Sequence, residues 1–143
     1  EAGNLMMGEL VSLLHEGGYS LVLQKDGKIH TFSERGVADL YRLRSENPEL
    51  LQGAFLADKV VGKGAAALMI LGGVAELHAD VISEPALSLL AESPVRVSYG
   101  EKVPSIRNRA RTGFCPLETL CKDAKTAAQC LPLIDEFINS MKK

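Results

Sequence analysis

The chain has 143 residues, of which 46% are hydrophobic and 24% charged, and its formal net charge is -2. These values are ordinary for a globular domain, and they exclude a disordered chain and a coiled coil. The near balance of charges does not favour nucleic acid as a partner of the whole surface. No apolar run approaches the roughly 20 residues of a membrane span. We therefore expect one soluble domain over residues 1–143, with no membrane and no nucleic acid among its partners.

The three cysteines indicate a reducing compartment. Cys115, Cys121 and Cys130 match neither a disulfide framework nor a Cys-x-x-Cys zinc pair. Reduced thiols in a cytoplasmic protein are the simplest interpretation. No secretory leader is visible, although the chain begins at Glu1 and not at Met. We expect a cytoplasmic protein with no metal and no cofactor.

The first 50 residues predict two helices on either side of a hairpin. The expected elements are a helix over residues 5–16, strands over 19–25 and 28–33, and a helix over 36–46. Gly17-Gly18 ends the first helix, and Asn47-Pro48 ends the second. Asp26-Gly27, between the two strands, is a strong signal for a tight hairpin turn.

After residue 50, short strands alternate with helices of roughly ten residues. The expected elements are strands over 54–57, 76–82 and 95–99, helices over 59–71 and 84–91, a charged linker over 100–113, and a helical stripe from 117 to the end. Asp58 and Ser83 are the expected N-caps, because Asp58 and Lys59 would be costly inside a buried strand. Pro132 is expected to kink or restart the last helix. The order predicts a three-layer α/β/α sandwich with the hairpin at one edge and parallel strands after it.

Two phosphate-binding motifs are approached but not met. Residues 57–64 miss two of the fixed positions of a P-loop. Residues 62–67 (Gly-Lys-Gly-Ala-Ala-Ala) fit a dinucleotide fingerprint, and Asp80 lies at the end of the next strand. A strand that ends at Ala57 places these glycines one turn inside the helix, so we favour close packing of that helix on the sheet. None of the three histidines has Glu two positions later, and no cysteine pair has the required spacing, which excludes a zinc deaminase centre.

Lys59 and Lys63 stand at i and i+4 in the first turns of the expected helix. Cations oppose the positive end of the helix dipole, and Gly62 and Gly64 weaken the same turn. One interpretation is an anion held at the helix N-terminus by ammonium groups and backbone N–H groups. The other is that both lysines extend to water and the glycines serve packing. The residues alone leave both open.

Two further segments carry chemistry. Cys115 is the expected N-cap of a helix whose capping-box acid is Glu118, a position that lowers the pKa of a thiol. The competing interpretation, which we favour, is a small buried apolar residue. Arg107, Asn108 and Arg109 lie in the linker, where guanidinium groups suit a phosphate or a carboxylate. A solvated loop, or pairing with acids of the same or a neighbouring subunit, is the alternative for these arginines.

Three stretches together resemble a known family: residues 53–67, Val81-Ile82-Ser83, and residues 106–118 without Ala110, Arg111 and Thr112. It is a bacterial family of unknown function grouped with the cytidine deaminase-like fold. The resemblance implies a three-layer sandwich around a mixed five-stranded sheet. On that template the zinc motifs would fall near residues 33–37 and 58–62, where this chain has no ligand set. The resemblance therefore implies no deaminase chemistry and supplies no activity.

The expected site lies at the carboxyl ends of the parallel strands, where such sheets bind ligands. Its ligand-binding residues are Asp58, Lys59, Lys63, Ser83, Arg107, Asn108, Arg109, Cys115 and Glu118. The first hypothesis is a binding or sensor module for a small anionic molecule that resembles a nucleotide or a phosphate. The second is an enzyme with Cys115 or Lys59 as nucleophile and Asp58 or Glu118 as acid or base. The third is a structural subunit that binds a partner chain, and a homo-oligomer is a related expectation.

Overall fold

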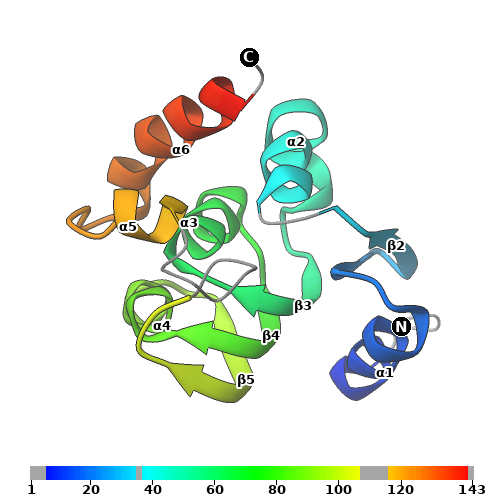
Figure 1. Cartoon of the computed structure of the whole chain (residues 1–143). Coiled ribbons are helices and arrows are strands. Elements are labelled where there is room, and N and C mark those ends of the chain that lie inside the picture. Colours follow the sequence, from blue (N-terminus) through cyan, green and yellow to red (C-terminus); the bar gives the residue numbers. More distant parts are fainter. Residues whose placement is uncertain (1–5, 35–36, 107–115, 142–143) are drawn as a thin grey trace.

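The computed structural model describes residues 6–34, 37–106 and 116–141. Five strands form one mixed sheet in the order β2-β1-β3-β4-β5 (Figure 1). The strands are β1 (Leu21–Lys25), β2 (Lys28–Phe32), β3 (Phe55–Val61), β4 (Glu76–Ser83) and β5 (Arg96–Val103). β1 is antiparallel to both β2 and β3, whereas β3, β4 and β5 are parallel. The predicted α/β class and the mixed five-stranded sheet are confirmed.

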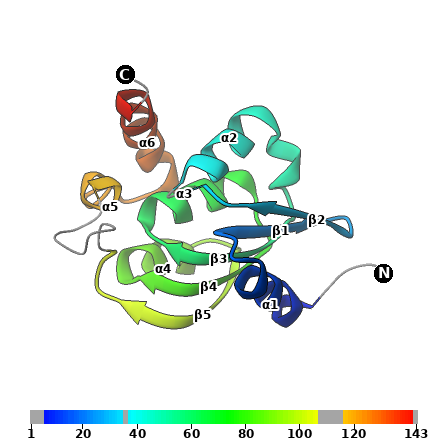
Figure 2. The ribbon, with the colours of Figure 1, turned by 45° about the vertical axis from the view of Figure 1, so that its right-hand side comes forward.

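The helices cover the two faces of the sheet unequally. They are α1 (Met7–Gly17), α2 (Ala38–Glu46), α3 (Lys63–Gly72), α4 (Glu84–Ala91), α5 (Pro116–Leu120) and α6 (Ala127–Met141), with a 3-10 turn η1 (Pro48–Leu50). α1 lies alone on one face and shares a small core of Leu10, Leu14, Val22 and Ala57 (Figure 2). The larger core on the other face joins α2, α3, α4 and α6 to the strands. Within the described ranges, no helix is long and apolar enough to cross a membrane.

The predicted first half of the fold agrees with the structure to within two residues at most element ends. α1 ends at Gly17, and its C-cap Gly18 has a φ of 66°, the left-handed conformation that glycine adopts readily. Asp26 and Gly27 both have positive φ, 52° and 78°, as a two-residue turn between twisted antiparallel strands requires. Local sequence chemistry is sufficient here because each signal lies inside the element that it defines.

The predicted end of β3 at Ala57 is wrong. The strand continues through Asp58 and Lys59 to Val61, and α3 begins at Lys63 with Gly62 as its N-cap. Pairing on both sides holds the extra residues, because Leu21 of β1 lies opposite Asp58 and Val81 of β4 lies opposite Val60. Burial raises the pKa of Asp58 to about 8, so this carboxyl group keeps its proton and avoids the cost of a buried charge. Asp58 is therefore a strand residue and not a helix cap.

The predicted continuous stripe after residue 117 is two helices, α5 and α6. α6 begins at Ala127 because Thr126 and Gln129 form a capping box. Thr126 Oγ1 accepts a hydrogen bond from the Gln129 N–H at 3.1 Å, and Gln129 Oε1 accepts one from the Lys125 N–H at 2.7 Å. The helix then continues through Pro132, where a kink or a restart was predicted, so the restart does not occur.

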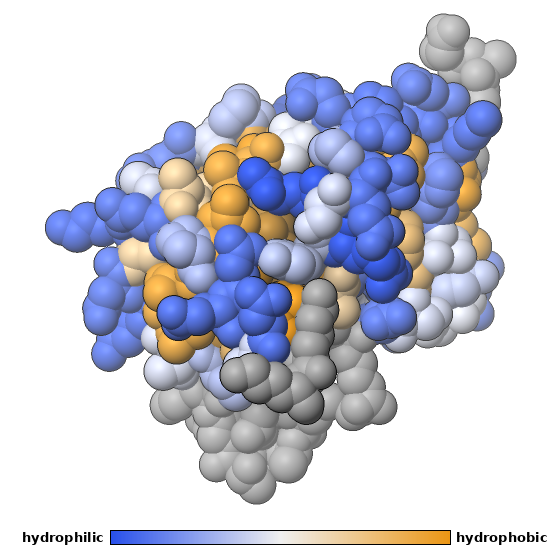
Figure 3. Space-filling model, turned by 90° about the horizontal axis from the view of Figure 1, so that it is seen from above, coloured by the Kyte–Doolittle hydropathy of each residue, from blue (hydrophilic) through white to orange (hydrophobic). Residues whose placement is uncertain are grey.

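α6 is the outermost helix of the larger core. Cys130 and Ile134 are fully buried, whereas Leu131, Phe137 and Ile138 are only partly buried against that core. Figure 3 views this end of the molecule from above and shows apolar side chains open to solvent among polar ones. α6 is thus held by one face, with apolar surface left at its margin.

Candidate functional site

Three of the predicted site residues meet at the carboxyl ends of β3 and β4. Glu118 of α5 accepts two hydrogen bonds at Oε2, from the Lys63 N–H at 2.7 Å and from Ser83 Oγ at 2.9 Å. Its Oε1 accepts a third, from the Ile106 N–H at 2.6 Å. Glu118 is 6% exposed. The anion expected at the N-terminus of α3 is therefore a carboxylate of the protein itself, and it satisfies a free N–H group of that helix.

The ammonium group of Lys63 is also engaged inside the protein. Its Nζ donates hydrogen bonds to the carbonyl oxygens of Lys122, at 3.1 Å, and of Ala124. These carbonyls follow α5, so Lys63 binds the end of α5 through its side chain and the side chain of Glu118 through its backbone. Lys63 is 7% exposed, so the interpretation in which its side chain extends to water is wrong for this lysine. Lys59 lies in β3, partly buried, and so does not share a helix face with it.

The glycines around Lys63 allow α5 to approach. A Cβ atom on Gly64 would lie 2.6 Å from Leu117 Cδ2, and one on Gly62 would lie 3.1 Å from Glu118 Oε2. The packing interpretation of these glycines is thus supported, although the contact is with α5. Because β3 ends at Val61, the glycines follow the strand directly, so the argument from placement against a dinucleotide fingerprint is wrong. Glu118 nevertheless takes the N–H group at which that fingerprint would hold a pyrophosphate.

Asp58 is separate from this cluster and lines a small hollow near the start of β1. The hollow has a volume of about 210 Å³ including its open mouth, and it is lined by Ser20, Leu21, Glu34, Asp39, Leu40 and Asp58. Burial is the main cause of the raised pKa of Asp58, and the charges of Asp80 and Asp39 raise it further. The N–H groups of Val60 and Lys59 act in the opposite direction, because they favour the ionised form. The hollow thus has a buried, protonated carboxyl group in its wall.

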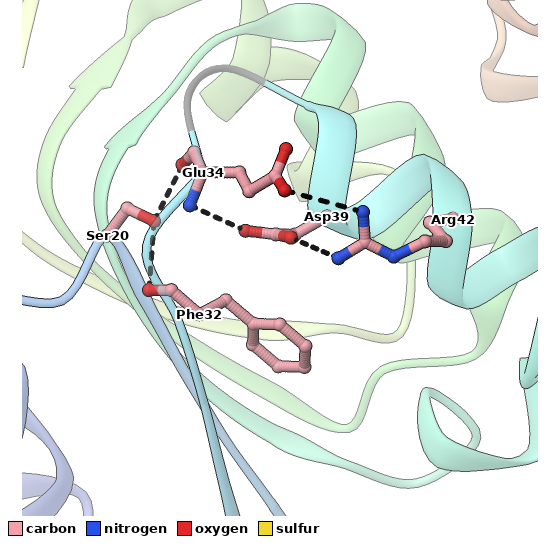
Figure 4. Close-up of polar contacts among 5 residues, drawn as sticks. All are labelled: Ser20, Phe32, Glu34, Asp39 and Arg42. Carbon is pink, nitrogen blue, oxygen red and sulfur yellow. Dashed lines mark hydrogen bonds and ion pairs between the residues drawn. The ribbon is translucent and has the colours of Figure 1, made fainter.

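A polar network fixes the rim of this hollow (Figure 4). Asp39, 4% exposed, accepts hydrogen bonds from the Glu34 N–H at 3.1 Å and from Arg42 Nη2 at 2.7 Å. Ser20 Oγ contacts the carbonyl oxygens of Glu34 and Phe32 at 2.8 and 3.0 Å. The backbone of Glu34 is therefore hydrogen-bonded through both its N–H and its carbonyl, and this residue lines the hollow.

The sequence analysis did not single out Ser20, Glu34 or Asp39. One local signal was available, since Asp39 is an acid in the first turn of α2 placed three positions before Arg42. The hollow itself follows from the pairing of Leu21 with Asp58 between β1 and β3. No local pattern indicates that pairing.

The opposite face of the sheet carries a second polar group. His15 Nε2 of α1 lies 2.7 Å from Asp80 Oδ2, and His78 Nδ1 lies 2.9 Å from Ser98 Oγ. His78 Nε2 is 3.8 Å from Asp80 Oδ1. Among the residues that the structure describes, no three His, Cys, Asp or Glu side chains are grouped so as to hold a metal ion. The contact of His15 with Asp80 attaches α1 to β4, and that of His78 with Ser98 joins β4 to β5.

The remaining predicted residues divide into two sets. Arg107, Asn108, Arg109 and Cys115 lie outside the described residues. Cys121 and Cys130 are free thiols and fully buried. Burial raises the pKa of both, that of Cys121 to about 12, so neither is a ready nucleophile.

Comparisons with known proteins give a family but no activity. A search of the curated proteins gives no match. A DUF1893 family protein (TM1506) from Thermotoga maritima shares 24% sequence identity at a TM-score of 0.83, over 95% of this chain and 94% of that one. This likeness shows the fold.

A diaminohydroxyphosphoribosylaminopyrimidine deaminase/5-amino-6-(5-phosphoribosylamino)uracil reductase from Thermotoga maritima is similar at 16% identity and a TM-score of 0.43. That match covers 66% of this chain and 35% of the other, and supports no argument about function. The profile of the family described as Domain of unknown function (DUF1893) matches residues 9–138, nearly the whole length. The chain belongs to the DUF1893 family.

Proposed function

We propose that the protein is a binding module for a small molecule and that a polar end of the ligand enters the hollow beside Asp58. One observation carries this proposal: a carboxyl group that is 9% exposed stands in the wall of an open hollow. A buried carboxyl group is costly to a fold, and functional sites are where such costs are retained. The cytidine deaminase-like grouping and the reducing, cytoplasmic location stay proposals beside it. The mixed sheet and the two free thiols support them.

The expected anionic, nucleotide- or phosphate-like part of the ligand needs cations other than Lys63. The N-terminus of α3 is capped by Glu118, and the Lys63 ammonium is bound by carbonyl oxygens. We propose Lys59, Arg107 and Arg109 for this role. Without its open mouth the hollow has a volume of about 10 Å³, room for little more than one water-sized group, so nearly all of the ligand would lie outside it.

An enzyme is the second candidate, and the pKa of Asp58 favours it. A carboxyl group with a pKa of about 8 can both hold and release a proton near neutral pH, as a general acid or base must. Cys115 and Lys59 remain the proposed nucleophiles for such a reaction.

The proposal can be tested by a thermal-shift screen with nucleosides, nucleotides, small amines and inorganic phosphate. A ligand at a hundred times its Kd adds about 2.7 kcal/mol of stability. We expect at least one compound to raise the Tm of the wild-type protein but not that of Asp58→Asn or Leu40→Trp, which would fill the hollow. Glu46→Gln, an exposed change at the other end of α2, is the matched control and should respond like wild type. A compound that stabilises all four proteins equally would place its site elsewhere.

A further inference from the structure

Among the residues that the structure describes, those that line the hollow beside Asp58 offer hydrogen-bond acceptors and no cationic donor. Its polar lining consists of Ser20, Glu34, Asp39 and Asp58. The single hydroxyl hydrogen of Ser20 is taken by one or the other of two carbonyl oxygens, 2.8 and 3.0 Å away, so toward the hollow its Oγ offers lone pairs. Apart from the proton that Asp58 itself holds, the lining accepts and does not donate.

The charges around the hollow are unbalanced. Arg42 lies 2.7 Å from Asp39 and 3.8 Å from Glu34, so one guanidinium faces two carboxylates. From β4, the charge of Asp80 also disfavours ionisation of Asp58, and Asp80 is itself paired with His15 of α1 at 2.7 Å. If Asp58 ionised, a third negative charge would join Glu34 and Asp39, for which Arg42 is the one cationic partner within the described ranges. One more positive charge would bring this group close to balance.

Asp58 has no side-chain partner in the part of the chain that the structure describes. Among the residues that the structure describes, no side chain donates a hydrogen bond to it, although it is 9% exposed. Only the N–H groups of Val60 and Lys59 favour its ionised form. A buried polar group without a matching partner is expensive. A hydrogen-bond donor that a ligand brings through the mouth of the hollow would offset the cost of burying the Asp58 carboxyl group.

We propose that the group entering the hollow is a protonated primary amine of a small ligand, a proposal that rests on the proposed function. Its three N–H bonds match the Asp58 carboxylate, a lone pair of Ser20 Oγ and a carboxylate of Asp39 or Glu34. An ammonium head group is small enough for the hollow, and the remainder of the ligand extends through the mouth. One positive charge enters as Asp58 releases its proton to solvent, so the net charge around the hollow does not change.

The test follows Asp58 directly, by carboxyl carbon NMR of labelled protein across a pH titration. The probe is ethylammonium chloride, compared at equal ionic strength with tetramethylammonium chloride, which has the same charge and no N–H, and with sodium acetate. We expect ethylammonium to lower the midpoint of the Asp58 titration by at least about one pH unit and to shift the methyl resonances of Leu21 and Leu40. Tetramethylammonium and acetate should do neither. In Asp58→Asn the ethylammonium-induced methyl shifts should vanish, whereas Glu46→Gln should retain them.

Each other outcome has a distinct meaning. If tetramethylammonium lowers the midpoint as much as ethylammonium does, the effect is charge screening and the amine proposal fails. If acetate, phosphate or a hit from the thermal-shift screen moves the Leu21 and Leu40 resonances while ethylammonium does not, the hollow binds ligands of another class. The proposed function then stands and the amine proposal fails. If no compound moves these resonances in wild type, both fail.

Discussion

Asp58 makes the stability of this protein depend on pH in the direction opposite to that of a salt-bridged carboxylate. Its pKa is raised by burial from the ordinary 3.8 to about 8. Below pH 3.8 both the folded and the unfolded chain hold the proton. Between the two values only the folded chain holds it, so the free energy of unfolding contributed by Asp58 falls as pH rises and is lost by about pH 8.

The variant Asp58→Asn removes this dependence, because the amide has nearly the shape of the protonated carboxyl group and does not titrate. We expect the variant to exceed wild type by at least about 1.4 kcal/mol at alkaline pH, the equivalent of one pKa unit, and to match it at about pH 4. Urea unfolding at both pH values measures the difference. The same stability change at acid and alkaline pH would show that Asp58 acts through packing alone.

Glu118 is a second side chain whose loss can be measured. Replacing it with Ala leaves three donors without their acceptor: the N–H groups of Lys63 and Ile106 and the hydroxyl of Ser83. We expect Glu118→Ala to destabilise the protein by about 3 kcal/mol, since a buried unsatisfied donor costs roughly 1–3 kcal/mol and the three losses overlap. Denaturant unfolding gives the value, with the exposed Glu92→Ala as control. A cost no larger than that of the control would mean that water replaces the carboxylate.

The sequence showed which side chains have unusual positions, but it did not show which groups they contact. Lys63, Ser83 and Glu118 were all predicted site residues, and they do meet. The unfavourable positions of Lys63 and its neighbouring glycines led us to predict a bound anionic ligand, whereas the carboxylate found there belongs to Glu118, 55 residues further along the chain. Asp58 was placed in a cap because a buried charge is costly, and that argument omitted protonation as a way to avoid the cost.

Among the helices, two N-caps of similar chemistry should differ in strength. Thr126 caps α6 through a single N–H group, that of Gln129. Ser83 caps α4 through the Ala86 N–H at 3.2 Å and also donates to Glu118. We expect Thr126→Ala to cost about 1 kcal/mol and Ser83→Ala clearly more. In double-mutant cycles with Glu118→Ala, the changes in unfolding free energy should add for Thr126→Ala. For Ser83→Ala they should deviate from additivity by about 0.5–3 kcal/mol. Additivity in both cycles would show that the Ser83 to Glu118 bond contributes no net stability.

Element boundaries were predictable wherever the signal is local. Ser83 was predicted as the cap of α4 and is, because a serine cap with a proline in the first helical turn, here Pro85, marks a helix start by itself. The C-terminal stripe was predicted as one helix because its apolar spacing continues past Lys122. The capping box at Thr126 was the local signal that could have divided it. The length of β3 was not predictable in this way, since β1 and β4 supply the pairing that extends it.

For the molecule as a whole, we expect the larger core to unfold cooperatively, as one unit. Cys121 and Cys130 are both fully buried in the core that also contains the strands and α3. We expect both thiols to resist alkylation in the native state. They should become reactive together, at the denaturant concentration that unfolds the sheet, because α6 has no separate core. Mass spectrometry of the alkylated chain alongside circular dichroism measures this. Labelling of Cys130 before the sheet unfolds would show that α6 opens independently.

The overall architecture was more accessible from sequence than the hollow was. Alternating strands and helices, with a hairpin first, are enough to specify an α/β sheet with parallel strands. The position of the hollow depends on which edge of β3 pairs with β1, and on where α2 begins after β2. Leu21 and Asp58 are 37 positions apart in the printed sequence, and their pairing in the sheet brings Asp58 to the hollow that Ser20 and Asp39 also line.

The three hydrogen bonds of Glu118 also bear on the order in which the protein is made. A ribosome delivers the chain from its N-terminus, so β3, α3, β4, α4 and β5 all emerge before residue 118. Until then the first N–H group of α3 and the hydroxyl of Ser83 lack the carboxylate that they bind in the finished fold. A nascent chain can therefore assemble its sheet early. It closes the carboxyl ends of β3 and β4 only near the end of synthesis, when the last fifth of the sequence becomes available.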